Sequence, residues 1–536
     1  TMRWWNGLWL NEAFATFMEM KCTDAFRPRW ERWVDFGISR TAAFEVDSLE
    51  STRPIEFEVV SPKDSAGMFD ILTYEKGAAV LRMLEQYLGE DAFRDGVRHY
   101  LTTHAYANTD TTDLWDSLEE ATGQPVRRIM DGWIFRGGYP LICAALDSTV
   151  LNLSQRRFSY QQVDLSDRTW EVPVLLRYGS GGDELTRRVL LTGTEASFDL
   201  GLKPDWLVVN SGATGFFRVN YSASLLEALL GAGLERLSAS ERYALVDDRH
   251  AAMVAGAVTS TDLVDLIGLL STETDLSVWQ RMAASLATLD RIVDGPARSR
   301  YQERVRGIVG PALERLGLEP VAGESQRTSQ LRGTLFESLG TVGADPAVRT
   351  RSREIHGKFV ADPASVDPAL AAASIAVIAD SGDAGEFEEF WRLSRQASSP
   401  QLAVRYLFSL GRFPDPALAR RLTTLATTEV RTQDAPFTLA RALANRVTGR
   451  QVWGFLAENW DRLIERFPGN TIVRMVGPIG GINDREWAGQ VESFFAGHEV
   501  PEGEKTLAQN LERMWTTVRL KEREGPRLAG DEQVAG

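Results

Sequence analysis

Cysteine and long apolar runs are scarce in this sequence, and each shortage excludes a class of protein. The 536 residues include only two cysteines, Cys22 and Cys143, which are too few for a disulfide framework and form no metal-type pair. A reducing, cytoplasmic compartment is therefore the default expectation. No apolar run approaches the roughly 18 residues that a membrane span requires. The most apolar stretch, residues 368–379, is short and Ala-rich, which predicts a buried helix.

Positive charge is also in deficit. Lysine and arginine total 59 against 74 aspartates and glutamates, so the formal net charge is −15. An acidic surface repels phosphate, and we therefore expect neither nucleic acid nor an anionic membrane surface as a partner. The remaining composition, 43% hydrophobic and 25% charged, is that of an ordinary globular protein, and the length is typical of several domains.

Self-contained catalytic motifs are missing as well. The sequence has five histidines but no H-E-x-x-H motif, and His99 and His104 do not have the spacing that places two ligands on one helical face. It also has no G-x-S-x-G elbow, no glycine-rich phosphate loop and no C-x-x-C pair. We interpret the histidines as surface or capping residues.

Hydrophobic periodicity divides the chain into parts of different type. Residues 1–137 have apolar residues at helical spacing, residues 138–221 form short β-branched and aromatic runs between turns, and residues 222–522 return to helical hairpins. This pattern predicts a multidomain, mainly α-helical protein with a small antiparallel β-sandwich and an α-solenoid C-terminal domain. Residues 523–536 are predicted to be a disordered tail. The helices expected in the first part cover residues 7–20, 28–44, 61–88, 91–103, 112–122 and 125–134.

Two residues of the first part have both a structural and a chemical interpretation. Glu12, Thr16 and Glu19 have the spacing of a solvent-exposed helical stripe, which is the commoner arrangement, and the alternative is that Glu12 is a metal ligand with Glu19 supporting it. Tyr74 begins an apolar helical run, where a tyrosine is either part of the core or a phenol that donates to a developing oxyanion. Spacing alone leaves these alternatives open.

Two longer segments carry a resemblance to a known family. MRWWNGLWLNEAFATFMEM, followed about sixty residues later by FDILTYEKGAAVLRML, resembles the zinc aminopeptidases of the aminopeptidase N family, the gluzincins. The similarity continues through GWIFRGGYPLI and WLVVNSGATGFFRVNY and reaches into the helical remainder. The resemblance implies that residues 1–137 are the C-terminal part of a thermolysin-like catalytic domain.

The same resemblance implies a role for each of the two residues. Glu12 of WLNEAFA matches the third zinc ligand, and Tyr74 of LTYEKGA matches the tyrosine that stabilises the tetrahedral intermediate. The family binds one Zn²⁺ per complete catalytic domain and acts on peptides with a free N-terminus. Two motif positions depart from the common family pattern, because Arg53 stands where the family has histidine and Ala13 where it has glycine.

The remaining catalytic groups of the family are expected outside this chain. The second histidine ligand would lie about eight residues before Thr1, so both histidines, the general-base glutamate and the segment that grips the substrate's amine would precede it. We therefore expect an N-terminally truncated chain that binds zinc weakly and is inactive alone. Its helix around Glu12 should leave Trp4, Trp5 and Trp9 partly exposed.

Two other functions compete with this interpretation. One is a non-catalytic interaction scaffold that retains the fold and binds partners through the solenoid. The other keeps the metal site but hydrolyses an epoxide, as some relatives do. Retention of both Glu12 and Tyr74 favours the peptidase over a scaffold, since a scaffold needs neither residue.

Overall fold

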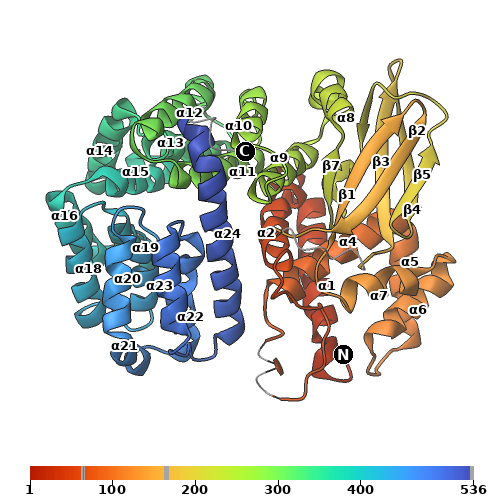
Figure 1. The fold of residues 1–536 in the computed structure, drawn as a ribbon, viewed down its shortest axis with the longest axis horizontal. Coiled ribbons are helices and arrows are strands. Elements are labelled where there is room, and N and C mark those ends of the chain that lie inside the picture. The colour runs from red at the N-terminus through yellow and green to blue at the C-terminus, as the bar shows by residue number, and fades with distance from the viewer. Residues whose placement is uncertain (62–63, 66, 162–167, 531–536) are drawn as a thin grey trace. The chain divides into compact units, whose positions relative to one another are not determined.

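The structure is a computed structural model that describes residues 1–61, 64–65, 67–161 and 168–530 (Figure 1). The chain forms two compact units, Thr1–Ala251 and Ala252–Gly536. The first unit contains helices followed by two β-sheets, and the second unit is helical throughout its described part. The prediction of a mainly helical protein with a small β-sandwich and a helical C-terminal region is therefore confirmed.

The helices of the first unit agree with the expected ones except at two starts and at the end of α1, which continues six residues beyond residue 20. Their bounds are α1 (Leu8–Phe26), α2 (Arg32–Asp47), α4 (Gly77–Leu88), α5 (Glu90–Thr103), α6 (Thr111–Thr122), α7 (Val126–Ile134), α8 (Ala223–Ala228) and α9 (Ala239–Val254). The helix expected from residue 28 is interrupted, because Glu31 takes a left-handed conformation (φ 50°) between a short 3₁₀ turn and α2.

The helix expected over residues 61–88 is shorter than predicted. Asp70 accepts hydrogen bonds from the backbone N–H groups of Leu72 (2.9 Å) and Thr73 (3.3 Å), and this side-chain cap starts the helix there. A π-helical turn, Leu72–Lys76, comes first and runs directly into α4. Residues 62, 63 and 66 lie outside the described residues.

The two sheets have the strand orders β5-β2-β1-β7 and β4-β3-β6. The strand bounds are β1 (Pro140–Asp147), β2 (Val150–Arg157), β3 (Val172–Ser180), β4 (Asp183–Leu191), β5 (Glu195–Asp199), β6 (Trp206–Val208) and β7 (Arg218–Tyr221). Neighbouring strands pair antiparallel except β1 and β7, which are parallel because the chain visits the other sheet between them. The expected antiparallel sandwich is thus correct apart from this one pair.

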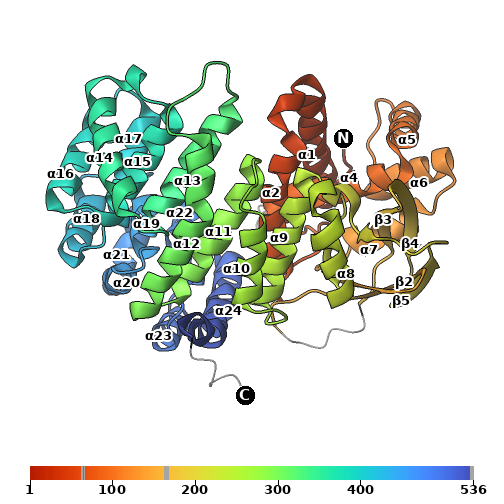
Figure 2. The ribbon, with the colours of Figure 1, turned by 90° about the horizontal axis from the view of Figure 1, so that it is seen from above.

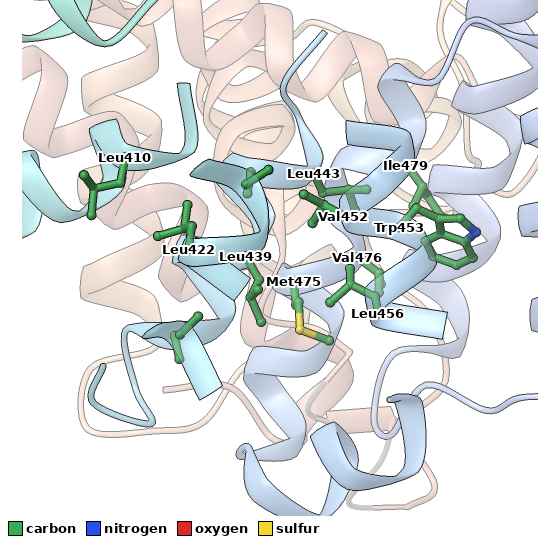
Figure 3. Packing of buried hydrophobic residues seen from close by; sticks show 14 of the residues in the cluster. Leu410, Leu422, Leu439, Leu443, Val452, Trp453, Leu456, Met475, Val476 and Ile479 are labelled. Carbon is green, nitrogen blue, oxygen red and sulfur yellow. The ribbon is translucent and has the colours of Figure 1, made fainter. Parts of the chain in front are cut away.

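The second unit is built from successive packed helices (Figure 2). They are α10 (Ser260–Leu269), α11 (Leu276–Ile292), α12 (Gly295–Leu316), α13 (Gln326–Gly340), α14 (Pro346–Ala361), α15 (Pro368–Ser381), α16 (Ala384–Gln396), α17 (Pro400–Ser409), α18 (Pro416–Thr428), α19 (Ala435–Leu443), α20 (Gly449–Glu458), α21 (Trp460–Arg466), α22 (Gly469–Val476), α23 (Arg485–Phe495) and α24 (Glu504–Ala529). Several start with an Asp or Ser cap followed by proline, whose fixed φ suits the first helical position. One apolar cluster extends from Ile375 to Val518, and Figure 3 shows leucines of α18, α19 and α20 gathered with Met475 of α22.

The end of the chain differs from the predicted tail. α24 continues to Ala529, so the disorder predicted from residue 523 is wrong for residues 523–529. The reason is tertiary contact: Glu524 is fully buried and accepts a hydrogen bond from the backbone N–H of Ser260 (2.8 Å), and Arg523 donates to the carbonyl of Met253 (2.6 Å). Residues 531–536 lie outside the described residues. The predicted domain boundaries at 137 and 221 remain a prediction.

Among the residues that the structure describes, no helix is both long enough and apolar enough to span a membrane.

Candidate functional site

Glu12 lies in the second turn of α1 and is partly buried. The first turn is fixed by Trp9, which is fully buried and donates its indole N–H to Glu56 Oε2 (2.8 Å) and Thr111 Oγ1 (3.1 Å). These bonds connect α1 to two distant parts of the unit, so the backbone beneath Glu12 is held in place. The exposure expected for three tryptophans is correct for Trp4 (59%) and Trp5 (46%) and wrong for Trp9 (0%), because Trp9 is this anchor.

Tyr74 lies in the middle of the π-helical turn Leu72–Lys76 and is also partly buried. π-Helical turns are rare and occur frequently at functional sites. Burial raises the pKa of the Tyr74 phenol, and a hydrogen bond to the Glu12 side chain and the negative charge of that carboxylate raise it further. The structure therefore brings the two predicted site residues together, although about sixty residues separate them in sequence.

A glycine where α1 packs against α4 makes this approach possible. Figure 1 labels both helices in the first unit. A Cβ atom on Gly77 would lie 2.6 Å from the Cβ of Ala13, which is far inside van der Waals contact. Ala13 is the residue next to Glu12, and Gly77 is three residues after Tyr74. The alanine at position 13, where the family commonly has glycine, is accommodated because the facing position has no side chain.

Arg53, the second departure from the family pattern, holds the start of the Tyr74 turn. Its buried guanidinium forms an ion pair with Asp70, the residue that caps this turn, and donates to Thr73 Oγ1 (2.9 Å). It also donates to the backbone carbonyls of Pro54 (2.7 Å) and Ile55 (3.0 Å). Arg53 thus ties the loop before the turn to the residue immediately preceding Tyr74, a role that the sequence did not indicate.

A fully buried ion pair holds the other end of the turn. Lys76 Nζ lies 2.7 Å from Asp47 Oδ2, at the end of α2, and both side chains are inaccessible to solvent. Lys76 also donates to the carbonyl of Gly138 (3.1 Å), whose own N–H donates to Asp47 Oδ1 (2.8 Å). Burial lowers the pKa of Lys76, and the charge of Asp47 opposes this. The turn that carries Tyr74 is therefore anchored on both sides.

Glu19 and Glu75 add two more carboxylates to this region. Burial raises the pKa of Glu75, and the negative charge of Glu19 raises it further, so the two carboxylates lie near one another. Glu75 Oε2 is buried and has no hydrogen-bond donor among the described residues. Glu19 itself is exposed and lies two turns after Glu12 on α1.

The donor chemistry of this region fits one position of a zinc site. The Glu12 carboxylate is a hard oxygen donor of the kind that zinc accepts, and the Tyr74 phenol beside it can donate a hydrogen bond. Within the described ranges, no group of three or more His, Cys, Asp and Glu residues could hold a metal ion. The other ligands of a catalytic zinc are therefore not among the described residues.

Comparison with protein families defines the class of protein. The Peptidase family M1 domain matches residues 1–133, and the ERAP1-like C-terminal domain matches residues 206–515. The second match covers more than half of the chain. The chain belongs to the M1 peptidase family, with an ERAP1-like C-terminal domain, and the resemblance seen in the sequence is confirmed.

The individual relatives are consistent with this class. The chain is 31% identical to Aminopeptidase M1-A of Oryza sativa subsp. japonica over 96% of its own length and 60% of that relative. It is 32% identical to Aminopeptidase M1 of Arabidopsis thaliana (96% of this chain, 61% of the relative) and 30% identical to Tricorn protease-interacting factor F2 of Thermoplasma volcanium (87% and 56%). The chain thus spans about three-fifths of the length of the curated relatives it matches.

Proposed function

We propose that this chain supplies one zinc ligand, Glu12, and the oxyanion-stabilising phenol, Tyr74, of a metallo-aminopeptidase that releases N-terminal residues from peptides. The observation that carries the proposal is that α1 packs against the π-helical turn, which brings the Glu12 carboxylate beside the Tyr74 phenol. The anchors on both sides of the Tyr74 turn support it, since a fixed geometry matters to catalysis and a phenol beside a carboxylate serves no purpose in a binding scaffold.

Glu12 would contribute one negative charge and one oxygen to the metal shell. Zinc, when bound, supplies a Lewis acid and lowers the pKa of a bound water to about 7. Glu12 can hold a fixed position because α1 is tied down through Trp9 one turn earlier. We further propose that Glu19, on the same helix, supports the metal site through its carboxylate.

Tyr74 would act where charge develops. When a peptide carbonyl becomes tetrahedral, its oxygen gains negative charge, and a phenolic O–H aimed at that oxygen stabilises it by about 3 kcal/mol. The raised pKa of Tyr74 keeps its proton in place at neutral pH, which a donor requires. The π-helical turn and the Arg53 and Lys76 anchors fix the position of the ring.

The printed chain would not catalyse this reaction alone. It contains no H-E-x-x-H motif, and one carboxylate cannot hold a catalytic zinc. The substrate class that we propose, peptides with a free N-terminus, therefore applies to the chain together with the missing ligands. We also propose a cytoplasmic location, because both cysteines are free and thiols stay reduced in that compartment.

The test of this proposal uses the chain joined to an upstream segment that carries H-E-x-x-H. Glu12→Ala should abolish both stoichiometric zinc, measured by metal analysis, and hydrolysis of an aminoacyl anilide. Glu227→Ala, at an exposed glutamate of α8, is the matched control and should change neither. A Glu12→Ala protein that holds one zinc and retains the parent activity would show that the ligand assignment is wrong.

A further inference from the structure

Two arginines of the first unit face one narrow recess. Arg40 comes from α2 and Arg82 from α4, and the recess between them is closed by Trp33, by the Gly212–Thr214 turn and by the first turn of α9. The charge of Arg40 is close enough to Arg82 to disfavour the charged form of the Arg82 side chain. Two like charges therefore meet in a partly desolvated space.

Among the residues that the structure describes, neither guanidinium forms an ion pair with a carboxylate. Arg40 is 7% exposed, its Nη1 donates to the carbonyl of Ala213, and its Nε has no acceptor among the described residues. Arg82 stacks on the Trp33 ring, with 3.4 Å from its guanidinium carbon to the ring centroid, and forms no ion pair within the described part of the chain. A buried donor without an acceptor is costly, so an acceptor in the recess would satisfy the Arg40 Nε–H group.

The carboxylates that act on these arginines from a distance are engaged elsewhere. Asp247, which faces Arg40, accepts from Arg218 (2.8 Å). Glu85, which faces Arg82, is paired with Lys21 (2.6 Å). Asp248, Asp24 and Glu90 are the other acidic groups nearby, and each accepts from another donor. These carboxylates favour the charged forms of Arg40 and Arg82 from a distance, but among the described residues none forms an ion pair with either guanidinium.

Other interior arginines of the unit are different. Arg53 is paired with Asp70, Arg177 with Glu241 and Arg218 with Asp247. In a chain with a net charge of −15, carboxylates are plentiful, and the two arginines of the recess differ from these three because the described residues form no ion pair with them.

The size and walls of the recess define what it can accept. Its cavity volume of about 10 Å³ is the room of about one water molecule or one ion of similar size. Its walls include the rings of Trp33 and Phe36 as well as the Ser240 side chain at the start of α9, where backbone N–H groups also favour negative charge. We propose that the recess binds one small monovalent anion, of the size of chloride, between Arg40 and Arg82.

This site is independent of the proposed peptidase function, because none of its residues contacts Glu12 or Tyr74 in the contacts described above. Burial, together with the neighbouring charge of Arg40, lowers the pKa of Arg82 to about 9, which leaves the side chain charged at neutral pH. The anion would offset the repulsion between α2 and α4 at this point and stabilise the first unit.

The direct test is a crystal of the full chain grown in sodium bromide in place of chloride. Bromide resembles chloride in charge and size and is located by its anomalous scattering. We expect one anomalous peak within hydrogen-bond reach of both the Arg40 and Arg82 guanidiniums. A recess that holds only water at saturating bromide would overturn the proposal.

The solution test follows unfolding of the first unit in urea while chloride replaces gluconate at constant ionic strength. Gluconate is too large for the recess. At chloride ten times the dissociation constant, the folded-to-unfolded ratio should rise about elevenfold, and above that it should rise in direct proportion to chloride, as one site requires. Acetate should have little effect on the folded-to-unfolded ratio. A rise of that ratio with acetate but not with chloride would overturn the assignment of ion size.

Variants separate this site from general salt effects. Arg82→Gln keeps a polar side chain at a partly buried position and should abolish the chloride response. Arg94→Gln, at an exposed arginine paired with Asp91, is the matched control and should keep it. A chloride response that survives in Arg82→Gln would contradict the proposal, and the bromide experiment tests it without any variant.

Discussion

The candidate site and the helical second unit hold their helices together by different means. At the site, α1, α2 and α4 meet through a glycine contact, Gly77 against Ala13, and through a buried ion pair, Lys76 with Asp47. In the second unit the helices meet through a continuous apolar cluster (Figure 3). The helices of the site also bury apolar side chains, but these close and charged contacts are added to that packing, whereas the cluster of the second unit is apolar.

This difference indicates what each region is built for. A buried ion pair is only weak evidence of stability, because desolvation offsets its attraction, but breaking it leaves an uncompensated charge. Apolar packing, in contrast, tolerates exchange between side chains of similar volume. We infer that the site region fixes one position for Tyr74, whereas the second unit needs only to fill its core.

The largest effect should come from breaking the ion pair. Lys76→Ala leaves the Asp47 carboxylate buried without a cation, and the free energy of unfolding of the first unit should fall by about 3–5 kcal/mol. Urea titration followed by tryptophan fluorescence measures this. The double variant Asp47→Leu with Lys76→Met should recover most of the loss; if it is no more stable than Lys76→Ala, the charge account is incorrect.

A core leucine of the second unit provides the contrasting case. Leu456 is fully buried in the apolar cluster, and Leu456→Ala should lower the free energy of unfolding of that unit by about 2–5 kcal/mol through lost burial and a cavity. Leu456→Met, which keeps the volume, should cost less than about 1.5 kcal/mol. Equal losses of stability for the two variants would mean that this core depends on the exact side chain, as the site does, and not only on filled volume.

Overpacking the helix crossing should have a smaller effect on stability and a clear one on geometry. In Gly77→Ala the new methyl group meets Ala13, and relief requires α1 and α4 to move apart at a cost of about 1–3 kcal/mol. In the chain joined to the H-E-x-x-H segment, activity should fall more than stability explains. Gly357→Ala, in a helix position with open space, is the control and should be neutral or stabilising.

The smallest effect should come from a helix cap of the second unit. The Asp383 side chain accepts a hydrogen bond from the backbone N–H of Glu386 (3.0 Å), and the Glu386 side chain accepts one from the backbone N–H of Asp383. The two bonds form a capping box at the start of α16. Asp383→Ala should cost about 1 kcal/mol in a thermal melt. A loss as large as that of Lys76→Ala would remove the distinction between the two regions.

The sequence predicted the parts of the structure that depend on local pattern. The helical periodicity of the first part and the motifs around Glu12 and Tyr74 were sufficient to identify these two residues as neighbours through the family resemblance. The strand β5 carries little sequence signal, because its residues alternate between exposed and partly exposed and show no apolar face. The parallel β1–β7 pair depends on the path of the chain through the other sheet.

The anchors of the site could not be predicted for a physical reason. Asp47 and Lys76 are a carboxylate and an amine in ordinary amphipathic helices, and only tertiary packing shows that both are buried. The role of Arg53 likewise depends on Asp70, a partner beyond its own loop. The final turns of α24 are ordered through Glu524, which accepts a hydrogen bond from the backbone N–H of Ser260, a residue far away in sequence.

The central claim, that Tyr74 stabilises developing charge beside Glu12, is tested most directly by Tyr74→Phe in the chain joined to the H-E-x-x-H segment. The account predicts full zinc occupancy, nearly unchanged KM and a fall in kcat of about 100- to 1,000-fold. The ring is kept, so the free energy of unfolding should change by no more than about 1–2 kcal/mol. A kcat within about threefold of the parent, with reduced stability, would contradict the catalytic role and assign Tyr74 to the core.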